Sequence, residues 1–151
     1  MRLIAFILLF LQVSCGAMRS GIKVEMAFDD RVQTENAIEL ANVEYGKNIL
    51  QLIDANHYIV IYKVPNESLE SHIAGVAYVG GLRCKIAIPE RTFDSGTEFL
   101  TTVIWHEIGH CYKLPHVTNP FDIMYTSVRN ITTYSTEVKQ QFLRRLYEAS
   151  H

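Results

Sequence analysis

The chain has 151 residues, of which 48% are hydrophobic, and its 14 lysine and arginine residues nearly balance its 16 aspartate and glutamate residues. This composition excludes a disordered chain, and the length favours one domain with a single core. Basic residues are not concentrated in any stretch, so we expect no nucleic-acid partner.

The first 17 residues have the pattern of a secretory signal peptide. One positive charge at Arg2 precedes an apolar run over residues 3–11, and small residues follow up to Ala17. The run is too short for a permanent membrane anchor. We therefore predict a signal peptide at residues 1–17 and an exported domain at residues 18–151, although a buried first helix would show the same pattern.

The three cysteines bear on the compartment. Cleavage after Ala17 would give a secreted protein, whereas cleavage before Cys15 would leave an N-terminal cysteine that can carry a lipid. We therefore expect either an extracellular protein or a cell-envelope lipoprotein attached to the membrane through Cys15. Cys84 and Cys111 could then pair, because an oxidising compartment permits disulfides. Two buried free thiols are the alternative.

Three elements are predicted in the N-terminal half. Apolar and polar residues alternate over 22–28, which predicts a strand. Apolar residues recur at helical spacing over 34–53, which predicts an amphipathic helix. The β-branched and aromatic residues over 58–64 predict another strand, which Pro65 ends.

A hairpin and a helix are predicted next. Residues 73–79 and 84–88 flank a turn that contains two glycines, so they are expected to pair as strands. Ser95-Gly96-Thr97-Glu98 matches a capping box, which predicts a helix from there to about residue 112.

The remaining residues complete the predicted fold. A looped stretch with Pro115 and Pro120 is followed by a helix over about 135–149. This order of elements predicts an α+β fold, in which a mixed twisted sheet packs against two long helices and a C-terminal helix. We expect this domain to be a monomer.

The second long helix carries a metal-binding pattern. His106-Glu107-Ile108-Gly109-His110 is an HExxH motif. Residues four apart lie on one helix face, so both imidazoles can reach one ion, and zinc favours such nitrogen ligands. Glu107 projects beside the ion, where it is placed to take a proton from a water molecule that the metal holds.

A third ligand is expected after the helix. His116 follows shortly after His110, and Pro115 forces Leu114 out of the helical conformation, so the chain leaves the helix there. Three protein ligands with one open position characterise a catalytic zinc site. An isolated HExxH motif also arises by chance in helices, and the third histidine is what makes this signal specific.

These residues resemble the zinc-binding motif of a known family. The sequence HEIGHCYKLPH over 106–116 resembles the HExxHxxGxxH motif of the metzincin metallopeptidases, and FDIMY over 121–125 resembles their Met-turn. The Met124-Tyr125 pair, and Tyr134-Ser135 before the last helix, are most similar to the matrixin branch. The resemblance covers about residues 75–147.

The resemblance implies a zinc-dependent endopeptidase that acts on extracellular proteins or peptides. The implied site residues are the zinc ligands His106, His110 and His116, the general base Glu107 and the supporting Met-turn residue Met124. The strand at 73–79 would form a cleft edge to which an extended substrate adds, and residues 125–134 would wall an apolar pocket. No propeptide is visible before the first predicted strand, so we expect activity on export or restraint by a separate inhibitor.

Lys113 departs from the family pattern, which has glycine at this position. The glycine permits a left-handed backbone conformation that turns the chain toward the third histidine. A lysine in that conformation costs roughly 1–2 kcal/mol, which a metal site can offset. The placement of His116 therefore depends on this residue.

Two other functions use similar residues. A zinc-stabilised binding or inhibitory module of the same fold would keep the ligands without catalysis, but such a module has no need of Glu107. A deformylase-like amide hydrolase also carries an HExxH motif, but the predicted export and His116 argue against it.

Overall fold

The computed structural model describes residues 22–26, 50–52, 59–80 and 83–149. The predicted signal peptide, and most of the helix predicted over 34–53, lie outside these ranges. The prediction is wrong for residues 50–52, because Leu50–Leu52 forms strand β2. The three residues pair in parallel with the first strand, and this tertiary pairing overrides their local helical spacing.

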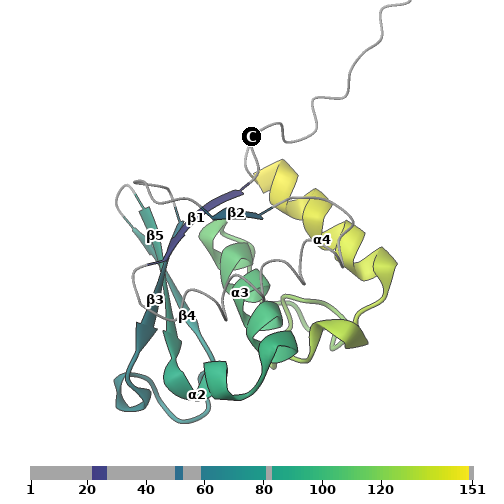
Figure 1. The fold of residues 1–151 in the computed structure, drawn as a ribbon. Coiled ribbons are helices and arrows are strands. Elements are labelled where there is room, and N and C mark those ends of the chain that lie inside the picture. The colour runs from purple at the N-terminus through teal and green to yellow at the C-terminus, as the bar shows by residue number, and fades with distance from the viewer. Residues whose placement is uncertain (1–21, 27–49, 53–58, 81–82, 150–151) are drawn as a thin grey trace, which may run out of the picture.

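Five strands form one mixed sheet in the order β2-β1-β3-β5-β4 (Figure 1). The strands are β1 (Ile22–Met26), β2 (Leu50–Leu52), β3 (Ile59–Val64), β4 (Val76–Gly80) and β5 (Arg83–Pro89). Strands β2, β1, β3 and β5 run parallel, whereas β4 pairs antiparallel with β5 as the predicted hairpin. Strand β4 starts three residues later than predicted, and it is an edge strand of the described sheet.

The helices form a second layer. They are α2 (Glu90–Asp94), α3 (Thr97–Cys111) and α4 (Thr136–Ala149), with 3-10 turns η1 (Asn66–Ser68) and η2 (Ile131–Thr133). Figure 1 shows α3 against the sheet and α4 on the far side of α3. Trp105 of α3 meets Phe142 of α4 edge to face, with 6.2 Å between ring centroids. The molecule is therefore the predicted α+β domain.

Hydrophobic burial fixes the position of α3. Leu100, Ile104 and Ile108 recur every four residues, so they share one helix face, and all three are fully buried. Strands β3 and β5 contribute alternating buried isoleucines to the same core: Ile59, Ile61, Ile86 and Ile88. Each such side chain stabilises the fold by about 1.5–3 kcal/mol relative to exposure. The helix that carries the HExxH motif is thus firmly held.

The capping box predicted at residues 95–98 is wrong. Gly96, with φ of 98°, precedes the first residue of α3, and no side chain caps that end. Ser95 instead belongs to the end of α2, where its hydroxyl donates to the carbonyl of Arg91 at 2.8 Å. Gly96 joins the unpredicted α2 to α3, and glycine adopts its positive φ without the steric cost of a Cβ.

The last helix begins where it was predicted. The amide of Val138 donates to the hydroxyl of Ser135 at 3.3 Å, which is the contact of an N-cap serine. In the part of the chain that the structure describes, no helix combines the length and apolar character needed to cross a membrane.

Candidate metal centre

Helix α3 ends in a Schellman turn at Lys113. The amide of Lys113 bonds to the carbonyl of His110 at 2.8 Å, and the amide of Leu114 bonds to that of Gly109 at 3.0 Å. Lys113 has φ of 62° and is the only non-glycine residue with positive φ in the described ranges. The left-handed conformation expected at this position is therefore present, and it turns the chain back toward α3.

The turn brings the three predicted ligands together. The Nε2 atoms of His106 and His110 lie 3.1 Å apart. The Nε2 atom of His116 lies 3.2 Å from that of His106 and 3.0 Å from that of His110. Three imidazole nitrogens therefore converge on one point, from a buried, a half-buried and an exposed side chain.

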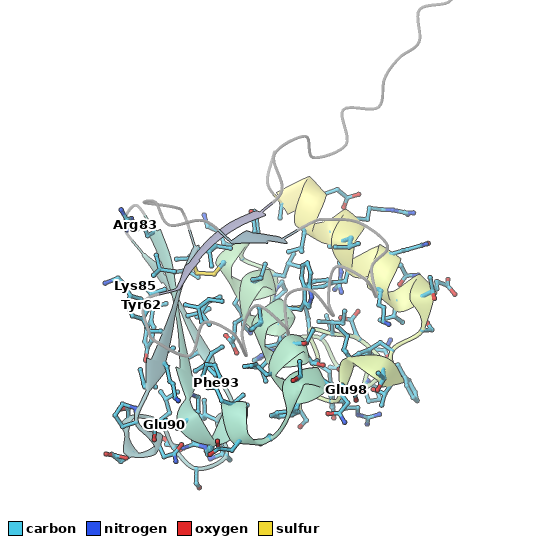
Figure 2. All side chains as sticks on the ribbon, viewed as in Figure 1. Tyr62, Arg83, Lys85, Glu90, Phe93 and Glu98 are labelled. Carbon is cyan, nitrogen blue, oxygen red and sulfur yellow. A yellow bond between two sulfur atoms is a disulfide. The ribbon has the colours of Figure 1, made fainter. Side chains whose placement is uncertain are left out.

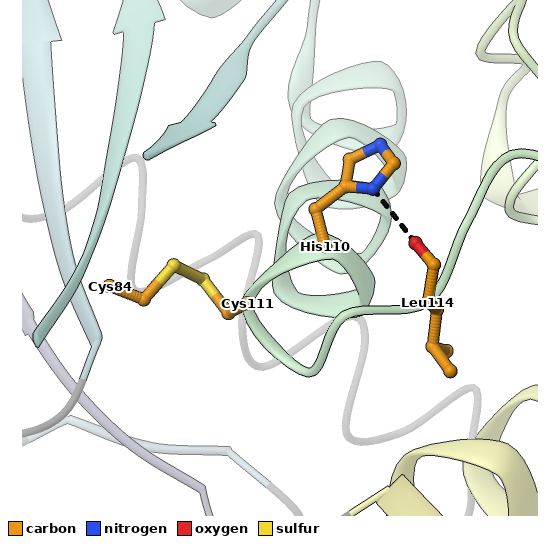
Figure 3. The surroundings of a disulfide bond; sticks show 4 residues. All are labelled: Cys84, His110, Cys111 and Leu114. Atoms are coloured by element: carbon orange, nitrogen blue, oxygen red, sulfur yellow. Dashed lines mark hydrogen bonds between the residues drawn. A yellow bond between two sulfur atoms is a disulfide. The ribbon is translucent and has the colours of Figure 1, made fainter. Parts of the chain in front are cut away.

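Hydrogen bonds fix the tautomers of two of these rings. Nδ1 of His106 donates to the carbonyl of Ile123 at 2.7 Å, and Nδ1 of His110 donates to that of Leu114 at 3.0 Å (Figure 3). The Nε2 atoms of both neutral rings consequently carry lone pairs that face each other. Two such lone pairs repel unless a cation lies between them, and metal-ligating histidines commonly donate their other N–H in this way.

The geometry and the charge state both fit zinc. Two nitrogens bound to one zinc ion at about 2.0–2.1 Å and a tetrahedral angle lie about 3.4 Å apart, close to the separations of 3.0–3.2 Å found here. Burial lowers the pKa of His106 to about 4 and also lowers the pKa of His110. Both rings are thus neutral, which is the form that binds a metal.

Glu107 lies beside the histidines and is only 4% exposed. Burial raises its pKa to about 7, and a hydrogen bond from the backbone amide of Ala77 opposes this rise only in part. Gly75 leaves room for the carboxylate, because a Cβ at that position would lie 3.2 Å from Oε1 of Glu107. A group with a pKa near neutrality can both accept and release a proton.

Met124 packs against α3 at Gly109. Its side chain is fully buried, and a Cβ on Gly109 would lie 2.3 Å from its sulfur atom. Glycine is therefore the residue that allows this close approach. The carbonyl that accepts the His106 hydrogen bond belongs to Ile123, the residue before Met124, so the backbone next to Met124 also orients one of the predicted ligands.

The residues that hold this turn were not predicted from the sequence. The amide of Met124 donates to the Asp122 carboxylate at 2.8 Å, and Arg145 of α4 donates to both oxygens of that carboxylate at 2.7 and 2.9 Å. Aspartate side chains commonly accept a hydrogen bond from the backbone amide two residues further on, in an Asx turn. Asp122 could therefore have been identified as the residue that holds this turn. No local pattern indicates Arg145 or the two carbonyls that orient the histidines.

A disulfide joins Cys84 of β5 to Cys111, the last residue of α3 (Figure 3). The structure thus decides between the two alternatives that the sequence left open. Both cysteines are 1% exposed. The cross-link ties the end of α3 to the sheet directly beside His110, and it therefore limits movement of this histidine.

The three histidines and Glu107 open into a cleft of about 840 Å³. Its lining includes residues 72–77, which reach into the start of β4, and Val79. It also includes Lys113 and Leu114 from the Schellman turn, and Thr126, Ser127 and Val128 from the segment that was expected to form a wall. The arrangement offers a metal-binding tripod and a buried carboxylate to a molecule in this cleft.

Comparisons with known proteins find a likeness at the level of the fold. The crystal structure of an archaemetzincin from Methanopyrus kandleri superimposes with a TM-score of 0.56, covering 85% of this chain and 97% of that chain, at 14% sequence identity. No protein-family model and no curated protein matches the sequence. The chain therefore shares the fold of an archaemetzincin.

Proposed function

We propose that this protein is an exported, zinc-dependent endopeptidase. The observation that carries the proposal is the convergence of the His106, His110 and His116 nitrogens beside the buried carboxylate of Glu107. A structural zinc site has four protein ligands, whereas a catalytic site has three and keeps one position for water or substrate. The likeness to an archaemetzincin is consistent with this function.

The residues of the chain have distinct roles in the proposed reaction. When bound, zinc would polarise the scissile carbonyl and acidify a water molecule. Glu107 accepts the proton of the attacking water and later delivers it to the leaving amine. The pKa of about 7 that burial gives this carboxyl group suits both transfers near neutral pH.

Strand β4 is the proposed substrate-binding edge. Among the strands that the structure describes, it pairs with β5 alone, and the segment leading into it lines the cleft together with Ala77 and Glu107. A peptide in extended conformation would add to this edge through main-chain hydrogen bonds. An open cleft beside a strand edge can accept a peptide bond in the interior of a longer polypeptide, which is the kind of bond that an endopeptidase cleaves.

Export from the cytoplasm and membership of a matrixin-like branch are also parts of the proposal. The Cys84–Cys111 disulfide supports export, because disulfides persist in oxidising compartments. Residues 1–17 would direct export, followed either by cleavage after Ala17 and release from the cell, or by cleavage before Cys15 and lipid attachment to that cysteine. The Met124-Tyr125 and Tyr134-Ser135 pairs support a matrixin-like branch.

Replacement of Glu107 by glutamine tests the catalytic role. Glu107→Gln keeps the shape of the side chain but removes the base, so we expect zinc to stay bound while digestion of casein falls at least a hundredfold. Glu90→Gln, at an exposed position (Figure 2), is the matched control and should change neither.

The outcomes separate the candidate functions. Chelator-sensitive digestion by the wild type that survives in Glu107→Gln would show that another group is the base. Zinc binding by the wild type without hydrolysis of any peptide would instead favour the zinc-stabilised binding module.

A further inference from the structure

Lys113 combines conformational strain with a position in the cleft. Its φ of 62° lies in the left-handed region, where a residue with a Cβ costs roughly 1–2 kcal/mol. Its side chain is exposed and lines the same cleft as the three histidines. Strained residues of this kind cluster at functional sites, so a role of the Lys113 side chain in the cleft is expected.

The ammonium group contributes nothing evident to the stability of the fold. It forms no ion pair or hydrogen bond with any other residue that the structure describes. Only its backbone amide is engaged, in the Schellman turn, and glycine would make the same bond without the strain. The positive charge is therefore free to meet a molecule in the cleft.

The charges around the cleft favour an anionic partner. Among the described lining residues, the acidic one is Glu107, which is buried beside the ligands, and Lys113 is the permanently basic one. His72 also lines the cleft, but it lies 3.7 Å from the Glu70 carboxylate, which offsets its charge when it is protonated. A zinc ion would make this region still more positive.

We propose that Lys113 determines specificity by favouring substrates that place a carboxylate near it in the cleft. The carboxylate belongs either to an acidic side chain of the peptide or to its C-terminus. This inference rests on the proposed peptidase function. Exposed ion pairs contribute about 0.2–1 kcal/mol, so the expected preference is about 1.4- to fivefold in kcat/KM.

The test measures a ratio of two substrates on one enzyme. Fluorogenic peptides are prepared as matched pairs, with glutamate or glutamine at one position at a time, and with a free or an amidated C-terminus. The glutamate-to-glutamine and free-to-amide ratios of kcat/KM are then compared in wild type, Lys113→Gln, Lys113→Arg and Lys113→Glu. A ratio does not depend on the fraction of folded enzyme, so a variant that folds less well remains informative.

Lys85→Gln is the matched control, because Lys85 is an exposed residue of β5 (Figure 2) that does not line the cleft. We expect a preference of about 1.4- to fivefold in wild type, Lys113→Arg and Lys85→Gln, a ratio near one in Lys113→Gln, and an inverted ratio in Lys113→Glu. The preference should shrink as salt is raised, since salt screens exposed charges. The side-chain and C-terminal series identify which carboxylate is recognised.

Binding separates this inference from the proposed function. The same peptides, labelled for fluorescence polarisation, are titrated into Glu107→Gln protein with and without the Lys113→Gln change. Cleavage or binding with no carboxylate preference, or with a preference that Lys113→Gln retains, overturns the role of Lys113. Tighter, Lys113-dependent binding of the carboxylate peptides without any cleavage by the wild type overturns the peptidase and leaves the recognition role intact.

Discussion

The disulfide between Cys84 and Cys111 gives a stability prediction whose size follows from the length of the loop it closes. The two cysteines are separated by 27 residues. In the chain-entropy treatment, a cross-link over such a loop destabilises the unfolded chain by about 3.5 kcal/mol at 25 °C. Reduction should lower the free energy of unfolding by this amount. With a urea m value of about 2 kcal/mol/M, the midpoint should fall by roughly 2 M.

The measurement is equilibrium urea unfolding of metal-free protein with and without reductant. Both cysteines are 1% exposed, so samples are reduced in the unfolded state and then refolded. The Cys84→Ala/Cys111→Ala variant is the control, and reductant should not change its midpoint. A loss of less than about 1 kcal/mol in the wild type, or an equal shift in the control, would refute the reasoning.

Three further substitutions test the supports of the site. Lys113→Gly should raise the free energy of unfolding by about 0.5–1 kcal/mol by removing the strain of the left-handed lysine, whereas Lys113→Ala, which keeps a Cβ, should give no gain in urea unfolding. Gly109→Ala should destabilise the protein by about 1–2 kcal/mol, since its Cβ would lie 2.3 Å from the Met124 sulfur and this crowding outweighs the better helix propensity of alanine. The loss should disappear when measured in a Met124→Ala background. Asp122→Ala should weaken zinc binding about tenfold in a competition titration, because the turn that orients His106 loses its carboxylate. Asp122→Asn, which can still accept from the Met124 amide, should have a smaller effect, and equal effects of the two changes would contradict this role.

The parts of the fold and site that could be predicted are those encoded by local spacing. The HExxH motif could be placed on a helix from its spacing, because residues i and i+4 share one helix face. The structure has this motif on α3. The turn toward His116 could be expected from the resemblance and from Pro115. Strand β3 was predicted from its β-branched and aromatic residues, and β5 was predicted as one half of the hairpin around the two-glycine turn.

The parts that could not be predicted depend on tertiary contacts. Leu50–Leu52 is a strand because β1 pairs with it. The local spacing of its residues predicts a helix and does not indicate that β1 is a partner. The predicted capping box is absent because the residue before α3 is Gly96, which has no side chain to accept a hydrogen bond. The Asp122–Arg145 ion pair joins residues 23 apart in sequence, and nothing in the sequence near either residue indicates the other.

The most direct test of the metal centre is X-ray absorption spectroscopy at the zinc edge, on protein loaded with one equivalent of zinc. Three histidine nitrogens at about 2.0–2.1 Å and one oxygen ligand from water are expected. The imidazole signal should fall by one third in His116→Ala. A spectrum with sulfur ligands, or one that is unchanged in His116→Ala, would contradict a site formed by His106, His110 and His116.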